Sequence, residues 1–333
     1  MQFNPSYILK STQRKQEAMI SYAMQDTFFA ELIHDLVDFG YEINFPLRAG
    51  AGAYQPFSVS TEAIDTPQKQ QQFTSGFWGM IEQGGVRAKL RFSALSSADM
   101  NAHYFLHEMM HFYQDMHGLY LLPIHEQGVF PILLDAKSDI VAILFCEAWA
   151  EVEAIRTSWA LREKGYPSGW NGAIRSPDWA DLARAYDHDL NEGVDEAKAA
   201  ANAFRRWYEG KHRRFYEEHA LKMHEMNLVR FKEGVEDFKE SEMTQNFRVL
   251  ELPMMIARVP QGGIPKYFHQ IDWDSDVYGQ VSTPEVLKRV QSLEERYGVA
   301  DNLNIQDIKC GAPSYLWHRL RGAEQQASEV LPH

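Results

Sequence analysis

Cysteine is almost absent from this chain. Its 333 residues include only two, Cys146 and Cys310, too few for the set of disulfides that holds small secreted domains together. Two thiols fit a protein of a reducing compartment, although the sequence leaves one bridge between them open. The fold must therefore be stabilised by a buried core, which a chain of this length with 45% apolar residues can form.

Long apolar runs and a secretion signal are missing as well. The longest apolar stretch covers residues 140–146, far short of the about 20 residues that a helix needs to cross a bilayer. The N-terminus lacks a basic start followed by an apolar stretch, so no signal peptide is expected. We therefore expect a soluble, cytoplasmic protein that does not enter a membrane; secretion without a classical signal peptide is the alternative.

Positive charge is also in deficit. Lysine and arginine total 33 against 46 aspartate and glutamate residues, which gives a formal net charge of −13. A nucleic-acid backbone attracts a basic surface, so no nucleic-acid partner is expected. The one basic run, residues 211–214, is interpreted as a solvated helix face; a patch for an acidic partner is the minority alternative.

Hydrophobic periodicity predicts an α+β fold that is mostly helical. Short strands and turns are expected within residues 41–60, and the alternation of apolar and basic residues at 86–92 predicts a half-exposed strand. Ser96 and Asp99 resemble a capping box at the start of the next helix. Residues 247–270 have an extended pattern. Helices are predicted at 13–39, 97–117, 138–165, 177–240 with breaks at Gly193 and Gly210, 282–298 and 314–329.

The segment with the clearest chemistry is His-Glu-Met-Met-His at residues 107–111. Histidines four residues apart on a helix are offset by only about 40° around its axis, so both imidazoles project from one face. One zinc ion can accept a nitrogen from each. Glu108 points to the side, where it can take a proton from a water on the metal as that water attacks a carbonyl. The segment thus predicts His107 and His111 as metal ligands and Glu108 as the catalytic base.

A catalytic zinc ion needs three protein ligands and one open position. The next predicted helix carries Glu147 and Glu151, four residues apart and therefore on one face. One carboxylate can bind the metal while the other accepts the far N–H of a ligating histidine. We predict Glu147 as the third ligand and Glu151 as the orienting carboxylate. The reverse assignment is one alternative, and pairing of Glu147 with Arg156 or a lysine is another.

This combination resembles the gluzincin branch of the zincin metallopeptidases, in which His-Glu-x-x-His on one helix is followed by Glu-x-x-x-acid on a second. Residues 106–170 also resemble an uncharacterised bacterial family described as a putative metallopeptidase domain. The shared features are His-Glu-x-x-His, a glutamine three residues later, here Gln114, and a Glu-Ala-x-Ala-Glu helix. The segment between His111 and Glu147 is longer here than in well-known gluzincins, and Glu151 stands where they have aspartate.

The resemblance implies a zincin-like active-site helix packed beside a small mixed sheet, one zinc ion, and hydrolysis of a peptide or protein substrate. The zincin-like domain is expected to cover residues 1–170. A helical C-terminal region, residues 171–333, would complete or cover the active-site cleft, with the boundary in the Pro- and Gly-rich stretch 166–178. The strand at 86–92 would hold an extended substrate by adding it to the sheet as a further strand.

Peptide hydrolysis also needs a donor that stabilises the oxyanion, often a tyrosine or histidine. Tyr267 and His269 are the preferred candidates. His103, four residues before His107, could supply a fourth nitrogen, although a place outside the coordination sphere is the preferred interpretation. Further candidate donors are His212, Tyr216, His219, His224 and Tyr315, whereas His117 and His125 are interpreted as residues without a catalytic role.

Two other functions compete with a zinc peptidase. A zincin fold that has lost its activity and serves as a binding or scaffold protein would keep the same motif. A di-iron carboxylate protein would use Glu108-x-x-His111 together with Glu209-x-x-His212. Gly210 makes the second element a poor site within a helix, and His107 would have no role in it. Metal analysis separates zinc from iron, and a Glu108→Ala variant separates catalysis from scaffolding.

Overall fold

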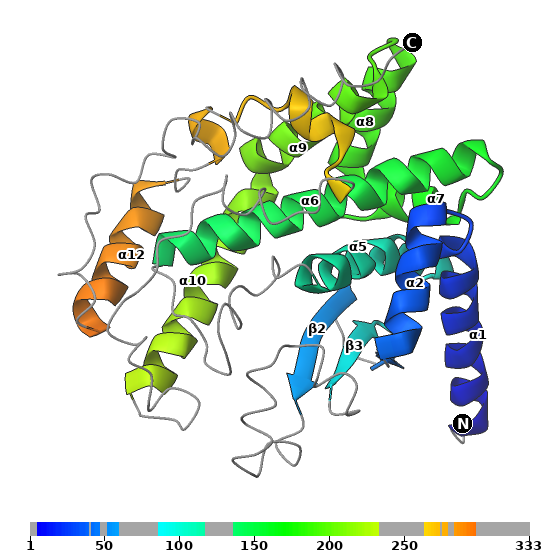
Figure 1. Cartoon of the computed structure of the whole chain (residues 1–333), viewed down its shortest axis with the longest axis horizontal. Coiled ribbons are helices and arrows are strands. Elements are labelled where there is room, and N and C mark those ends of the chain that lie inside the picture. The colour runs from blue at the N-terminus through cyan, green and yellow to red at the C-terminus, as the bar shows by residue number, and fades with distance from the viewer. Residues whose placement is uncertain are drawn as a thin grey trace, which may run out of the picture. The chain divides into compact units, whose positions relative to one another are not determined.

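The protein is α+β and mostly helical, as predicted (Figure 1). Its chain forms two compact units. Unit 1 comprises Met1–Met116, Gln127–Val129 and Glu147–Phe204, and unit 2 comprises His117–Glu126, Phe130–Cys146 and Arg205–His333. The computed structural model describes residues 5–39, 41–46, 52–59, 86–116, 136–232, 263–273, 275–278 and 283–297.

The two units do not follow the predicted division after residue 170, because each takes part of helix α6 (Ala136–Glu163) and of helix α9 (Glu196–Glu209). Compact units defined by contacts need not be the units that carry separate functions. The assignment of a peptidase domain to residues 1–170 and of an accessory region to residues 171–333 therefore stays a prediction.

The sheet of unit 1 has three strands in the order β1-β3-β2. Strand β3 (Val86–Phe92) pairs in parallel with β1 (Tyr41–Asn44) and antiparallel with β2 (Gly52–Val59). The sheet is therefore mixed, as expected. The prediction that residues 86–92 add a substrate strand is wrong, because both backbone edges of this central strand are already hydrogen-bonded within the sheet. The alternation in the sequence indicated a half-exposed strand, but it could not show which neighbours flank it.

The sheet packs on the helix that carries the motif. In β3, Leu90 and Phe92 are buried whereas Arg91 between them is exposed, which is the predicted period of two. The ring of Phe92 lies 6.0 Å from the ring of Phe105. Phe105 belongs to α5 (Ala98–Met116), which also packs on β2, α1, α2 and α7. Every residue from 101 to 114 is buried, as expected of a helix with neighbours on all sides.

The start of α5 differs in detail from the predicted capping box. The hydroxyl of Ser97 accepts a hydrogen bond from the backbone N–H of Met100 at 3.1 Å, so Ser97 is the N-cap residue and Ser96 is not. Asp99 accepts a hydrogen bond from the hydroxyl of Ser168 at 2.6 Å. Its carboxylate therefore connects α5 to Ser168, at the start of the helix formed by residues 168–175, and does not act as the second residue of a capping box.

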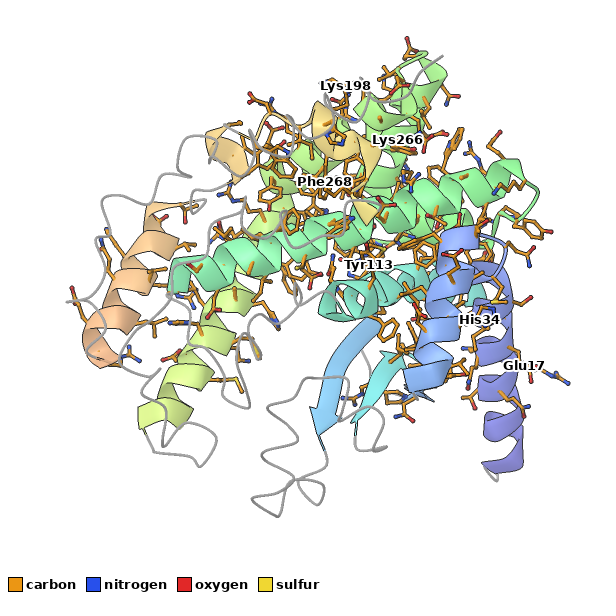
Figure 2. The ribbon with its side chains drawn as sticks, viewed as in Figure 1. Glu17, His34, Tyr113, Lys198, Lys266 and Phe268 are labelled. Carbon is orange, nitrogen blue, oxygen red and sulfur yellow. The ribbon has the colours of Figure 1, made fainter. Side chains whose placement is uncertain are left out.

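The helix predicted at 13–39 is two helices, α1 (Pro5–Ala23) and α2 (Thr27–Phe39). The break follows from Asp26, whose side-chain oxygen accepts a hydrogen bond from the backbone N–H of Phe29 at 3.2 Å and so caps α2. Figure 2 labels Glu17 on α1 and His34 on α2, and both residues are exposed.

The predicted boundary stretch 166–178 contains a helix, α7 (Ser168–Arg175), which packs closely on α5. A Cβ atom at Gly172 would lie 2.2 Å from the carbonyl oxygen of Asp99, so only glycine allows this approach. The glycine therefore serves close packing within unit 1, and the prediction of a functional boundary in this stretch stays a prediction. Gly165, with a φ of 91°, lies in the turn that directly follows α6, a conformation that suits glycine.

The remaining helices agree with the predicted pattern in most places. Helices α8 (Ala180–Asn191), α9 and α10 (Lys211–Lys232) are separated at the predicted glycines, and α12 (Pro284–Tyr297) matches the helix expected at 282–298. Residues 266–270 form a 3-10 helix, η5 (Lys266–Gln270), so the extended prediction is wrong there. The helix predicted at 314–329 lies outside the described residues. In the described part of the chain, no helix combines the length and apolar character required to span a bilayer.

Candidate metal centre

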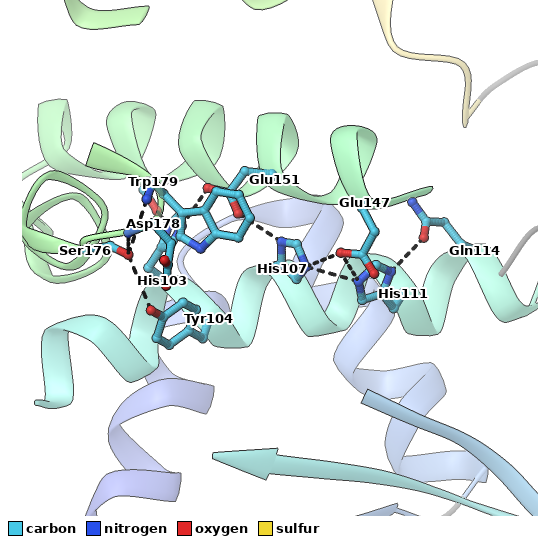
Figure 3. Close-up of polar contacts among 11 residues, drawn as sticks. His103, Tyr104, His107, His111, Gln114, Glu147, Glu151, Ser176, Asp178 and Trp179 are labelled. Carbon is cyan, nitrogen blue, oxygen red and sulfur yellow. Dashed lines mark hydrogen bonds and ion pairs between the residues drawn. The ribbon is translucent and has the colours of Figure 1, made fainter. Parts of the chain in front are cut away.

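Helix α5 and the part of α6 that belongs to unit 1 bring three predicted ligands together. His107 and His111 project from α5 and Glu147 projects from α6, and all three side chains are buried (Figure 3). Nε2 of His107 lies 3.0 Å from Nε2 of His111. Oε2 of Glu147 lies 3.3 Å from the first nitrogen and 3.4 Å from the second. These three residues form a group that could hold a metal ion.

The other ring nitrogens of both histidines have acceptors. Nδ1 of His107 lies 3.0 Å from Oε2 of Glu151, and Nδ1 of His111 lies 2.9 Å from Oε1 of Gln114. A carboxylate oxygen and an amide oxygen can only accept, so each Nδ1 carries the hydrogen and donates it. In the neutral rings both Nε2 atoms are then lone-pair acceptors that face each other and the Glu147 carboxylate. Such an arrangement requires a positive charge among the three atoms, either a metal ion or a proton.

The pKa values of these groups show the same demand for positive charge. Burial alone would lower the pKa of His107, but hydrogen bonds to Glu147 and Glu151 raise it well above its ordinary value. Burial would raise the pKa of Glu147, yet the charges of His111 and His107 hold it well below the usual range. The pKa of Glu151 falls to about 2, because His103 and His107 outweigh the effect of burial. Both carboxylates are therefore ionised at neutral pH.

The contacts favour Glu147 over Glu151 as the third ligand. Glu147 approaches Nε2 of both histidines, the nitrogens that face each other, whereas Glu151 contacts Nδ1 of His107. Arg156, the alternative partner considered for Glu147, pairs instead with Glu153 and with a second glutamate on α9. The exchange of roles between Glu147 and Glu151 thus receives no support from the geometry.

Glu108 lies next to His107 on α5 and is buried, with 5% of its surface exposed. Its negative charge contributes to the raised pKa of His107, so the carboxylate lies near this candidate ligand. This position suits a group that removes a proton beside the metal. The role of Glu108 as the catalytic base stays a prediction.

One neighbour of the site had no signal in the sequence. The ring of Trp179 stacks on the ring of His107, with centroids 6.0 Å apart and planes 24° apart. Trp179 sits at the start of α8, where the hydroxyl of Ser176 accepts hydrogen bonds from the backbone N–H groups of Asp178 and Trp179. The same Ser176 hydroxyl lies 3.3 Å from the hydroxyl of Tyr104, which belongs to α5. The tight turn thus places the indole of Trp179 against His107, a candidate ligand that is distant in sequence.

Other predicted site residues lie elsewhere or outside the described residues. Tyr267 and His269 lie on η5 in unit 2, and their role as oxyanion donors stays a prediction. Glu209 ends α9 whereas His212 lies in α10, so they do not form the helical Glu-x-x-His element that a di-iron site needs. The candidate donors His212, Tyr216, His219 and His224 all lie on α10, whereas His117, His125 and Tyr315 are not among the described residues.

Residues 82–229 match the model of a family described as "Putative metallopeptidase family (DUF6782)". This range contains all of α5 and α6, and with them the motif, the candidate ligands and Glu151. Searches of curated proteins and of solved structures find no match to the chain. The similarity of this region to a metallopeptidase family suggests a metal ion and a peptide or protein substrate. The region from residue 82 to residue 229 is thus the putative metallopeptidase domain that the sequence resemblance implies.

Proposed function

We propose that this protein is a zinc-dependent metallopeptidase in which His107, His111 and Glu147 hold one zinc ion and Glu108 is the general base. The observation that carries the proposal is the convergence of three acceptor atoms within 3.0 to 3.4 Å of one another, in a site where both Nδ1 hydrogens are already donated. Three buried lone pairs repel one another unless a cation lies between them.

The donor set supports zinc in particular. Two imidazole nitrogens and one carboxylate oxygen are the ligands of one class of catalytic zinc sites, which keep a fourth position open. A di-iron site would need more carboxylates and a second Glu-x-x-His element. Within the described part of the chain, His107, His111 and Glu147 are the one group of three such side chains close enough to share an ion.

Each nearby side chain has a separate task in the proposed reaction. A zinc ion would act as a Lewis acid on the scissile carbonyl and lower the pKa of a neighbouring water. Glu108, as a carboxylate, takes a proton from the attacking water and passes it to the leaving amine. Glu151 and Gln114 hold the Nδ1 hydrogens of His107 and His111, which keeps both Nε2 lone pairs directed at the ion.

An extended substrate requires a free strand edge, which the central strand β3 does not offer. Strand β2 packs against α5, and in the described residues its backbone pairs with β3 alone. Its outer edge is therefore the place where a peptide backbone would add to the sheet close to the motif helix. We propose β2, in place of β3, as the strand that aligns the substrate.

The test combines metal analysis with peptide cleavage. The purified protein is expected to contain one zinc ion per chain and to cleave members of a mixed peptide library followed by mass spectrometry. A Glu108→Gln variant should keep its zinc and lose about 10²- to 10⁴-fold in cleavage rate, the usual contribution of a general base. Glu153→Gln is the matched control, because Glu153 is equally buried but pairs with Arg156 on α6.

Three results would count against the proposal. A wild-type protein without zinc would contradict the proposed metal site. An active Glu108→Gln variant would contradict the role of Glu108 as the general base. Zinc binding without cleavage of any library peptide would favour the alternative of a zincin fold that serves binding or scaffolding.

A further inference from the structure

Glu151 is held from two sides. Its side chain is fully buried, and each of its two oxygens contacts a different histidine. Oε2 lies 3.0 Å from Nδ1 of His107, and Oε1 lies 3.0 Å from Nε2 of His103. Because the carboxylate is ionised and can only accept, both imidazoles donate to it. His103 therefore supplies the second hydrogen bond that a buried carboxylate needs.

The chain of contacts continues beyond His103. Its Nδ1 lies 3.5 Å from the hydroxyl oxygen of Ser158. Since Nε2 of His103 carries the hydrogen given to Glu151, Nδ1 of the neutral ring accepts from the Ser158 hydroxyl. Figure 3 shows His103 and His107 along α5, with Glu151 of α6 between them. Ser158 thus donates to His103 and His103 donates to Oε1 of Glu151, while His107 donates to Oε2 of the same carboxylate.

We propose that His103 is a positioning residue that acts through Glu151 to fix the ring of His107 and thereby strengthens metal binding. This inference rests on the proposed metal site. A carboxylate held by one donor can rotate about its last side-chain bond and release the imidazole. With His103 bound to Oε1, Oε2 stays directed at Nδ1 of His107, and the ring cannot turn its Nε2 away from the other ligands.

The same contacts explain why His103 is not a fourth ligand. Both of its ring nitrogens are engaged by Glu151 and Ser158, and it is not part of the group that could hold an ion. Direct partners of metal-ligating histidines change metal affinity by about 10- to 100-fold when removed. His103 acts one contact further away, so a loss of about 10-fold, at the lower end of that range, is expected.

Two substitutions of similar size separate the contacts of His103. In His103→Gln the amide nitrogen can take the place of Nε2 and still donate to Glu151. In His103→Asn the shorter amide reaches only the place of Nδ1, so the contact with Ser158 can remain while the one with Glu151 is lost. Zinc affinity, measured by competition with a chromogenic chelator, should fall about 10-fold in His103→Asn and stay within about 3-fold of wild type in His103→Gln.

A double-mutant cycle tests whether His103 acts through Glu151. His103→Asn should weaken zinc binding in the wild-type background and change it little in a Glu151→Gln background, because the intermediate contact is already altered there. The absorption spectrum of the cobalt-substituted protein reports the ligand geometry directly. It should shift in His103→Asn and resemble wild type in His103→Gln. Thermal melting of the metal-free variants measures any loss of stability separately.

The outcomes distinguish this inference from the proposed function. Equal zinc affinity of His103→Asn and wild type, or the same loss in both backgrounds of the cycle, would overturn the positioning role while leaving the peptidase proposal intact. Zinc binding that follows the expected pattern in a protein without peptidase activity would support positioning and contradict the proposed catalysis. A wild-type chain that binds no zinc would contradict both.

Discussion

Metal binding at this site should release one proton, and the zinc affinity should therefore rise with pH. In the metal-free protein the three facing atoms need a positive charge, and the raised pKa of His107 indicates a proton on its Nε2. The pKa of Glu147 is well below the usual range, so this ligand has no proton to lose near neutral pH. The Nδ1 hydrogen of His107 stays with Glu151 in both states.

The pH dependence of the zinc affinity follows from the number of protons released. If one proton leaves for each zinc ion bound, the apparent association constant rises about tenfold per pH unit below the metal-free pKa of His107, which is about 1.36 kcal/mol per unit. Because that pKa is raised well above 6.5, the rise should continue beyond the pH at which an ordinary histidine is already neutral. Above the pKa, the affinity should level off.

The stability of the protein freed of metal by a chelator should fall with rising pH, opposite to the zinc affinity. The folded-state pKa of His107 is raised, so its protonated form stabilises the fold fully below about pH 6.5, the unfolded value. This contribution is lost as the pH rises through the folded-state pKa. The free energy of unfolding of the chelated protein should therefore fall above pH 6.5, whereas excess zinc should prevent that fall.

Calorimetric titration with zinc between pH 5.5 and 8.5, in buffers of different ionisation enthalpy, counts the protons released. A flat affinity across this range, or a release of no proton at pH 6.5, would refute the reasoning. Urea-unfolding curves at the same pH values, recorded once with a chelator and once with excess zinc, measure the predicted change in the free energy of unfolding.

Two further predictions concern single side chains. Glu147→Ala should reduce zinc affinity by at least about 100-fold, as loss of a ligand exceeds the effect of an outer partner, whereas Glu153→Ala on the same helix should leave zinc affinity unchanged; competition with a chelator measures both. Gly172→Ala would place a Cβ atom 2.2 Å from the carbonyl oxygen of Asp99, and should destabilise the fold by about 1–3 kcal/mol, as overpacking does. A Gly172→Ala protein with an unchanged melting temperature would contradict the close packing of α7 on α5.

Residue patterns within single helices and strands predicted the features of this protein that depend on local periodicity. The period of apolar residues identified most helices and the alternation in β3, and the four-residue spacing placed His107 and His111 on one face and Glu147 and Glu151 on another. The break between α1 and α2 was missed, because a single capping aspartate interrupts a continuous apolar pattern. The glycines of α7 resembled a linker, since the sequence does not record which backbone lies against them.

The sequence by itself determined the chemistry available, which is two imidazoles and two carboxylates at helical spacing. Only the tertiary structure decided which carboxylate faces the paired Nε2 atoms, that β3 is the central strand, that Trp179 stacks on His107, and that His103 and His107 share the carboxylate of Glu151. Those choices depend on contacts between segments that are distant along the chain, and the spacing of residues within one helix carries no information about the side chains that a second helix presents to it.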